Sequence, residues 1–185
     1  MRLHLVRMHP TDHEPFLPNA SRLPSTRRSG LHGVGKPITL LLMIITLRVT
    51  CVRGPYLKEP CVRVLEMDED SCLYDLHDAI QDAVDFERDH PFSFFLANVP
   101  GGNRQWLTEA EEWRDMEDDF CRILLREVFP TGRRRLYYLF DFGDYWTFEV
   151  RKARGSKPAE AAVTYPRLVE SLGPDPVQYP AWDEK

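Results

Sequence analysis

Apolar positions along the middle of the chain first follow the period of β-strands. Residues 38–52 form an apolar run rich in β-branched side chains, and residues 61–67 alternate apolar and polar side chains. A period of two is typical of a strand with one buried face. The two runs therefore predict an antiparallel pair of strands.

The pattern then changes to the period of an amphipathic helix. Asp70 or Ser71 is a suitable N-cap, and apolar residues follow at steps of three and four as far as about Phe86. These residues are Leu73, Leu76, Ile80, Ala83 and Val84, and the opposite side carries Asp75, Asp78, Asp82 and Asp85. We expect one face of this helix in the core and an acidic face in solvent.

A third strand and a second helical region follow. Residues 92–96 form a short aromatic run that predicts a strand. Thr108 and Glu111 form a capping box, and an apolar stripe continues from there to Phe129. This stretch predicts one long helix, or two helices with a break near Asp118.

The hairpin is the best-defined local element. Residues 136–142 and 145–150 flank Gly143-Asp144, and glycine suits a two-residue primed turn. In that register one face carries Tyr137, Leu139, Asp141, Trp146, Phe148 and Val150, and the other carries Tyr138, Phe140, Phe142, Tyr145, Thr147 and Glu149. Both faces are aromatic, so we expect both to be covered.

The order of these elements, ββαβα(α)ββ, predicts the fold class. We expect an α+β, two-layer domain with a mixed or mainly antiparallel sheet of about five strands packed by two or three helices. The 15 prolines concentrate in the two flanks. The predicted organisation is a disordered basic arm (residues 1–36), a core domain (residues 37–157) and a Pro-rich C-terminal tail (residues 158–185) that packs on or trails from the core.

Composition narrows the function classes. The 185 residues carry 24 Lys and Arg against 29 Asp and Glu, a net charge of −5, with 43% hydrophobic and 11% aromatic residues. These values exclude a generally basic nucleic-acid binder and an acidic disordered chain. The four cysteines form no C-x-x-C pair, and the longest apolar run is about half the roughly 20 residues of a membrane-spanning helix. We expect reduced cysteines, no membrane segment and a cytoplasmic location.

Basic residues gather at both ends of the predicted hairpin. Arg133, Arg134 and Arg135 precede it, and Arg151, Lys152, Arg154 and Lys157 follow it. Because the two ends of a hairpin meet, these charges form one candidate patch for phosphate or an acidic partner. The alternative is a solubilising role, in which Lys and Arg protect a sheet edge from aggregation.

A second candidate site combines histidines with the hairpin aspartates. The predicted register places Asp141 beside Trp146 on an apolar face, where a carboxylate needs a partner. Asp141 and Asp144 could simply fix the turn by accepting backbone amide hydrogens. Alternatively, they could converge with His77 and His90 in a polar pocket suited to metal or acid/base chemistry. No motif in the sequence indicates a cofactor or a set of metal ligands.

Four segments taken together resemble a known family. They are Tyr74 to Ala83 with its Leu-His-x-x-Ile-Gln core, Asp89 to Phe94, Tyr138 to Trp146 with Asp-Phe-Gly-Asp-x-Trp, and Tyr165-Pro166-Arg167. In this order they resemble the plasmid pRi ORF-three-like family, also labelled insertion-element passenger proteins. The resemblance covers roughly residues 57–180. It implies a compact α+β domain from bacterial chromosomes and mobile elements, and it implies no particular activity.

Two hypotheses about function follow from the sequence. The first is a non-enzymatic binding or accessory protein with a protein or nucleic-acid partner at the basic hairpin end. The second is a metal-dependent or acid/base enzyme that uses the candidate pocket. The distances among the pocket residues, which are His77, His90, Asp141, Asp144 and Trp146, distinguish the two hypotheses.

Overall fold

The computed structural model describes residues 42–108 and 119–180. The chain divides into two units, residues 1–38 and residues 39–185. All the described residues belong to the second unit, and the predicted basic arm lies outside them.

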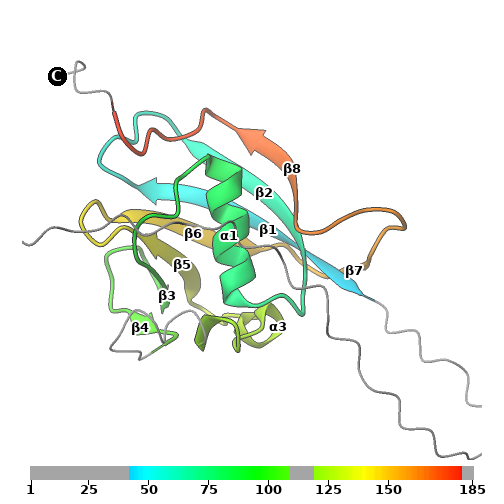
Figure 1. Cartoon of the computed structure of the whole chain (residues 1–185). Helices are drawn as coiled ribbons and strands as arrows, with labels where there is room; N and C mark the ends of the chain where they lie inside the picture. Colours follow the sequence, from blue (N-terminus) through cyan, green and yellow to red (C-terminus); the bar gives the residue numbers. More distant parts are fainter. Residues whose placement is uncertain (1–41, 109–118, 181–185) are drawn as a thin grey trace, which may run out of the picture. The chain divides into compact units, whose positions relative to one another are not determined.

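One antiparallel sheet makes up most of the described structure (Figure 1). Its strands are β1 (Met43–Arg53), β2 (Cys61–Asp68), β3 (Phe92–Ala97), β4 (Gln105–Trp106), β5 (Arg135–Phe140), β6 (Trp146–Lys152), β7 (Lys157–Pro158) and β8 (Arg167–Leu172). The strand order is β4-β3-β5-β6-β1-β2-β8, and β7 pairs with the start of β1. The long strand β1 therefore joins the aromatic hairpin β5-β6 to β2 and β8.

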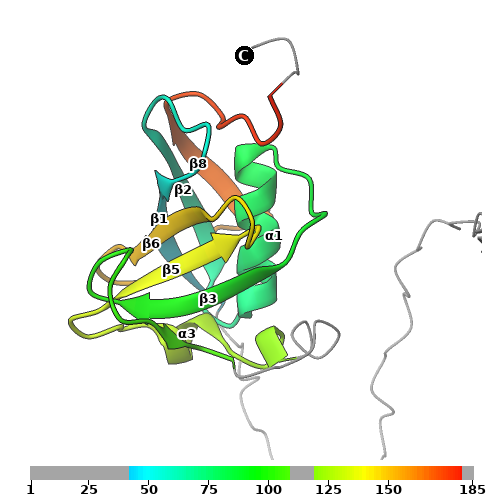
Figure 2. The same cartoon turned by 90° about the vertical axis from the view of Figure 1, so that its left-hand side faces the viewer.

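Two helices accompany the sheet in the described residues, α1 (Leu73–Val84) and the short α3 (Leu125–Val128). Helix α1 packs against one face of the sheet (Figure 2). The Asp75 carboxylate accepts a hydrogen bond from the Cys72 amide (2.7 Å), so the helix begins after Cys72 and not after Asp70 or Ser71. Its apolar stripe enters the main core between the sheet and the helix.

The predicted fold class is wrong. The described residues form an eight-stranded, mostly antiparallel sheet with two short helices, instead of five strands packed by two or three helices. Strands β4 and β7 have two residues each, and β8 is largely exposed, so none of the three has the alternation that sequence reasoning detects. The expected long helix toward Phe129 falls partly on residues 109–118, outside the described residues. In its described end Asp119 and Phe120 are helical, residues 121–124 are not, and the one-turn α3 follows.

The predicted hairpin register is also wrong, by one residue. Phe140 pairs with Trp146, so residues 141–145 form a five-residue loop in place of a two-residue turn. Asp141 and Tyr145, rather than Gly143, take positive φ angles (55° and 57°). A shift of one residue exchanges the two faces of a strand. Tyr138, Phe140, Trp146 and Phe148 consequently face the main core, whereas Tyr137, Leu139, Thr147 and Glu149 lie on the opposite face.

Candidate anion-binding cavity

An open cavity of about 590 Å³ lies at the end of the hairpin where β5 begins and β6 ends. The pairing of Leu136 with Val150 brings together the segment before β5 and the segment after β6. The residues that line the cavity are Phe129, Pro130, Thr131, Gly132, Arg133, Arg134, Arg135, Val150, Arg151, Lys152, Ala153, Arg154 and Gly155. Six of these residues are cationic and none is acidic. They include all the residues of the predicted basic patch except Lys157.

Glu149 orients two of the cavity arginines. Its carboxylate accepts hydrogen bonds from Arg135 Nη1 (2.8 Å), from Arg151 Nε and from the Tyr137 hydroxyl (3.1 Å). Burial alone raises the pKa of Glu149, but these hydrogen bonds outweigh it and hold the pKa below its usual value. One carboxylate thus holds two guanidinium groups beside the cavity while neutralising only one of the two charges.

The remaining cations of the cavity differ in their contacts. Arg134 hydrogen-bonds to the Gln105 side chain, and Lys152 Nζ donates to the Gly155 carbonyl (2.9 Å). Arg133 and Arg154 are exposed, and within the described part of the chain neither forms a side-chain hydrogen bond or an ion pair. Lys157 points elsewhere, toward Glu66 (2.7 Å) and Glu160 (2.9 Å). The cavity therefore keeps an excess of positive charge.

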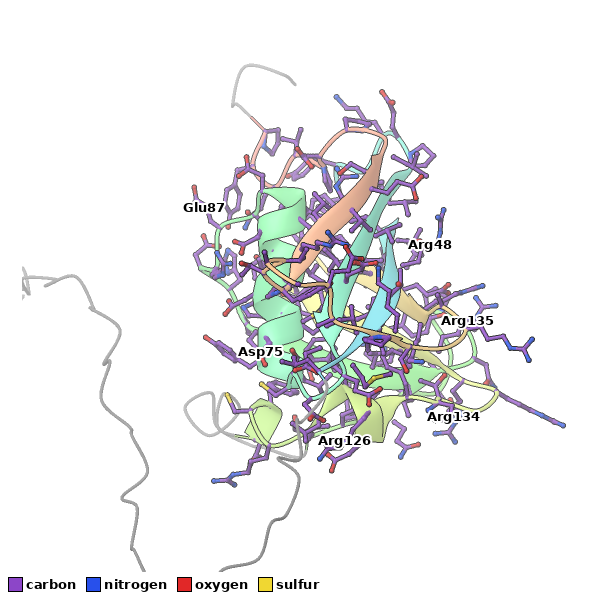
Figure 3. The ribbon with its side chains drawn as sticks, turned by 90° about the vertical axis from the view of Figure 1, so that its right-hand side faces the viewer. Arg48, Asp75, Glu87, Arg126, Arg134 and Arg135 are labelled. Carbon is purple, nitrogen blue, oxygen red and sulfur yellow. The ribbon has the colours of Figure 1, made fainter. Side chains whose placement is uncertain are left out.

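Arg48 adds a further cation that the sequence analysis missed. It lies on β1 directly opposite Arg151 of β6, and it is exposed. Figure 3 shows Arg48, Arg134 and Arg135 on the side of the ribbon that faces away from α1. Like charges opposite one another on a sheet destabilise it, and a bound anion would relieve this repulsion. In the sequence Arg48 is only a single charge within an apolar strand. Its position opposite Arg151 follows from the pairing of β1 with β6 and cannot be predicted from the local pattern.

Two members of the predicted His/Asp pocket do come together. His90 Nε2 lies 3.7 Å from Asp141 Oδ2 and 3.8 Å from Asp89 Oδ2. The other oxygen of Asp141 accepts the amide hydrogens of Gly143 (2.8 Å) and Asp144 (3.2 Å). Asp141 thus fixes the turn through one oxygen and faces His90 with the other.

His77 lies apart from this pair, in the core. Its Nδ1 is 2.6 Å from the Tyr138 hydroxyl, and its ring stacks on Phe92 with centroids 3.7 Å apart. Burial, aided by the positive charge of Arg88, lowers the pKa of His77 to about 3. The burial of the His77 ring and its lowered pKa indicate a structural role in the core.

The last two predicted pocket residues also take structural positions. Trp146 is 1% exposed and packs edge-to-face on Phe86, with centroids 5.0 Å apart. A β-carbon on Gly54 would lie 2.0 Å from the Trp146 ring, so this close approach requires glycine. Asp144 contributes its backbone amide to the turn. Among the described residues, no three His, Cys, Asp or Glu side chains are grouped as a metal ion would require.

The described structure is thus a single antiparallel sheet with a basic cavity at one end of the β5-β6 hairpin. Its two described helices lack the length and hydrophobicity needed to cross a membrane. The family model described as "Plasmid pRiA4b ORF-3-like protein" matches residues 44–178. The chain belongs to this family, which confirms the family that the four sequence segments indicated.

Two further similarities accompany the family match. "Uncharacterized protein y4hQ" of Sinorhizobium fredii (strain NBRC 101917 / NGR234) is 33% identical over 99 residues, which are 53% of this chain and 47% of that protein. The match therefore spans about half the length of this curated relative. A crystal structure of a protein of unknown function, MM3350 from Methanosarcina mazei Go1, aligns with a TM-score of 0.55 and 24% identity, covering 71% of this chain and 70% of that chain. This second similarity concerns the fold alone.

Proposed function

We propose that this chain is a binding protein whose basic cavity takes phosphate groups of a nucleic acid. The observation that carries the proposal is the lining of the cavity, with six cationic side chains and no acidic one in a chain of net charge −5. Five of the six cations are arginines. The planar guanidinium donates two parallel hydrogen bonds to phosphate oxygens, whereas lysine acts as a point charge.

The contacts within the cavity support the same proposal. Arg133 and Arg154 can receive an incoming phosphate without giving up a side-chain contact in the described structure. Arg135 and Arg151 are already oriented by Glu149, so less conformational entropy is lost when they bind. A solubilising edge needs charge but no such orientation.

Salt dependence of binding tests the proposal. We expect a fluorescein-labelled 12-nucleotide single strand to bind at 50 mM NaCl, with log affinity falling linearly against log salt by about 0.7 per neutralised phosphate. The double variant Arg133→Ala/Arg154→Ala should weaken binding and reduce this slope by about 1.4. Fluorescence anisotropy titrations at several salt concentrations measure both quantities.

The matched control removes two positive charges elsewhere. Lys58 and Arg122 are exposed and outside the cavity, so Lys58→Ala/Arg122→Ala should leave the slope unchanged. No binding at 50 mM NaCl, or an equal effect of the two double variants, would contradict the proposal. Equal competition by poly-glutamate and by polyphosphate would instead indicate an acidic protein as the partner.

A further inference from the structure

An aromatic row crosses the sheet face opposite α1. The strand register places Trp106 of β4, Phe95 of β3 and Tyr137 of β5 side by side, and Glu149 of β6 comes next. Phe95 and Tyr137 are fully buried, whereas Trp106 at the edge of the sheet is 43% exposed. The row therefore ends in an accessible indole ring.

The Trp106 ring is held in place from one side. It meets Phe95 edge-to-face with centroids 5.2 Å apart, and the Arg104 guanidinium lies 5.4 Å from the centroid of Trp106 and 4.6 Å from that of Phe95. A cation over an aromatic face is attracted to the ring and restricts its movement. The indole is thus oriented in advance while a large part of its surface remains open to a ligand.

An arginine row runs beside the aromatic row on the same face. Arg135 and Arg151 lie two residues from Tyr137 and Glu149 along their strands, and Arg48 pairs with Arg151. Arg104 stands at the other end, over Phe95. From Phe95 of β3, over which the Arg104 guanidinium lies, to β1 there are three strand spacings of about 4.8 Å, so the arginine row extends for about 14 Å. The hydrogen bond from Arg134 to Gln105 connects the cavity directly to β4.

We infer that this face binds a single-stranded nucleic acid, with phosphates along the arginine row and an unpaired base stacked on Trp106. The inference rests on the proposed function and adds the class of nucleic acid to it. Base stacking on an aromatic ring needs a free base face, which a duplex keeps inside its own stack. An acidic peptide without aromatic residues would satisfy the arginines but would give Trp106 no ring to stack on.

Two probes with identical phosphates separate the inference from the proposed function. One probe is a 12-nucleotide oligo(dT), and the other is a 12-mer of abasic deoxyribose phosphates. We expect the parent to bind oligo(dT) about tenfold more tightly than the abasic strand, with quenching of tryptophan fluorescence. A 12-base-pair duplex should bind more weakly than oligo(dT).

Substitution of Trp106 provides the decisive comparison. Trp106→Ala should lower the affinity for oligo(dT) to the abasic level and leave the affinity for the abasic strand unchanged. The matched variant Trp106→Phe keeps an aromatic ring and should retain most of the preference for oligo(dT). Circular dichroism and thermal unfolding of both variants confirm that the fold is intact.

The possible failures are distinguishable. If the abasic strand binds but Trp106→Ala does not change the affinity for oligo(dT), the inference that a base stacks on Trp106 is wrong. The proposed phosphate-binding function of the cavity is then retained. Equal binding of duplex and single strand likewise overturns the inference alone. If neither strand binds the parent at 50 mM NaCl, both the inference and the proposed function fail.

Discussion

Tyr138, Gln81 and His77 form a hydrogen-bonded chain inside the core. Gln81 Nε2 donates to the Tyr138 hydroxyl (2.8 Å), which leaves that hydroxyl to donate to Nδ1 of His77 (2.6 Å). The neutral imidazole then carries its proton on Nε2. Because the hydroxyl hydrogen is already committed to Nδ1, a protonated His77 would lose its acceptor role and bury a charge.

This arrangement predicts that acid destabilises the protein through His77. The pKa of His77 falls from 6.5 to about 3 on folding, so between these values the unfolded chain binds a proton that the folded chain does not. The contribution of neutral, buried His77 to the free energy of unfolding is therefore fully present well above pH 6.5. It is lost as the pH falls below 6.5, by about 2 kcal/mol at pH 5. Urea unfolding at several pH values measures this loss.

His77→Gln is the matched variant because it removes the titration and keeps a polar side chain next to Tyr138. Its free energy of unfolding should depend less on pH between 6.5 and 5 than that of the parent. A variant with the same pH dependence as the parent would show that His77 is not the group responsible. Glu66 and Glu149 contribute little to the pH dependence between 6.5 and 5. The pKa of each is lowered from 4.5 in the folded chain, so both groups change their protonation mainly below this range.

The β5-β6 hairpin depends on its loop, and Asp141 is the main residue of that loop. The Asp141 carboxylate accepts two amide hydrogens, and its backbone φ of 55° is unfavourable for most side chains. Asp141→Ala should therefore lower the free energy of unfolding by about 2 kcal/mol. Asp141→Asn can accept the same hydrogens and tolerates this φ, so its loss should stay below about 1 kcal/mol. Chemical denaturation of both variants tests this difference, and equal losses would contradict it.

Local patterns were sufficient for the long, regular elements, but not for the short or exposed strands β4, β7 and β8 or for the hairpin register. The alternation in β2 and the helical spacing in α1 are properties of short segments, so the sequence predicts both. The hairpin register depends on whether the loop has two residues or five, and Gly143 favours the shorter loop although Asp141 and Tyr145 take the positive φ angles. That single difference places Arg135 and Tyr137 on the face of the sheet that carries Glu149 and Arg151.

The candidate site was predictable to a similar degree. The basic cavity follows from sequence, since any hairpin brings the residues before and after it together, whatever its register. Arg48 and Trp106 belong to other strands, and only the strand order places them on the same face as Arg151. The predicted His/Asp pocket does not form, because His77 is buried in the core. Of the four predicted His and Asp residues, only His90 and Asp141 lie close together.

The sheet separates two differently charged sides of the described structure. On the α1 side, Arg88 pairs with Asp78 (2.8 Å) and Asp82 (2.5 Å) of the exposed helix face, which still keeps an acidic excess. On the other side lie the arginine row and the cavity. A polyanion should therefore approach from one side only, so the net negative charge of the chain is compatible with the proposed binding face.

Arg63 connects the helix, the sheet and the C-terminal segment. It extends from β2 and is only 2% exposed. Its Nε donates to the Ala83 carbonyl (2.8 Å) near the end of α1, and Nη1 donates to the carbonyls of Val62 (2.8 Å), Leu172 (3.3 Å) and Gly173 (3.3 Å). Its Nη2 pairs with Asp175 (2.5 Å). One guanidinium thus satisfies carbonyl groups from three parts of the molecule.

Removing this guanidinium should loosen all three parts together. Arg63→Met keeps much of the side-chain volume but leaves buried carbonyls without donors, so we expect a loss of about 3 kcal/mol in the free energy of unfolding. Asp175→Asn is the matched control, because the Asp175 side chain is 57% exposed and its ion pair should contribute less than about 1 kcal/mol. Hydrogen exchange should show lost protection at β8 and at the end of α1 in Arg63→Met alone. If Arg63→Met is as stable as Asp175→Asn, the carbonyl contacts of Arg63 do not hold the C-terminal segment to the sheet.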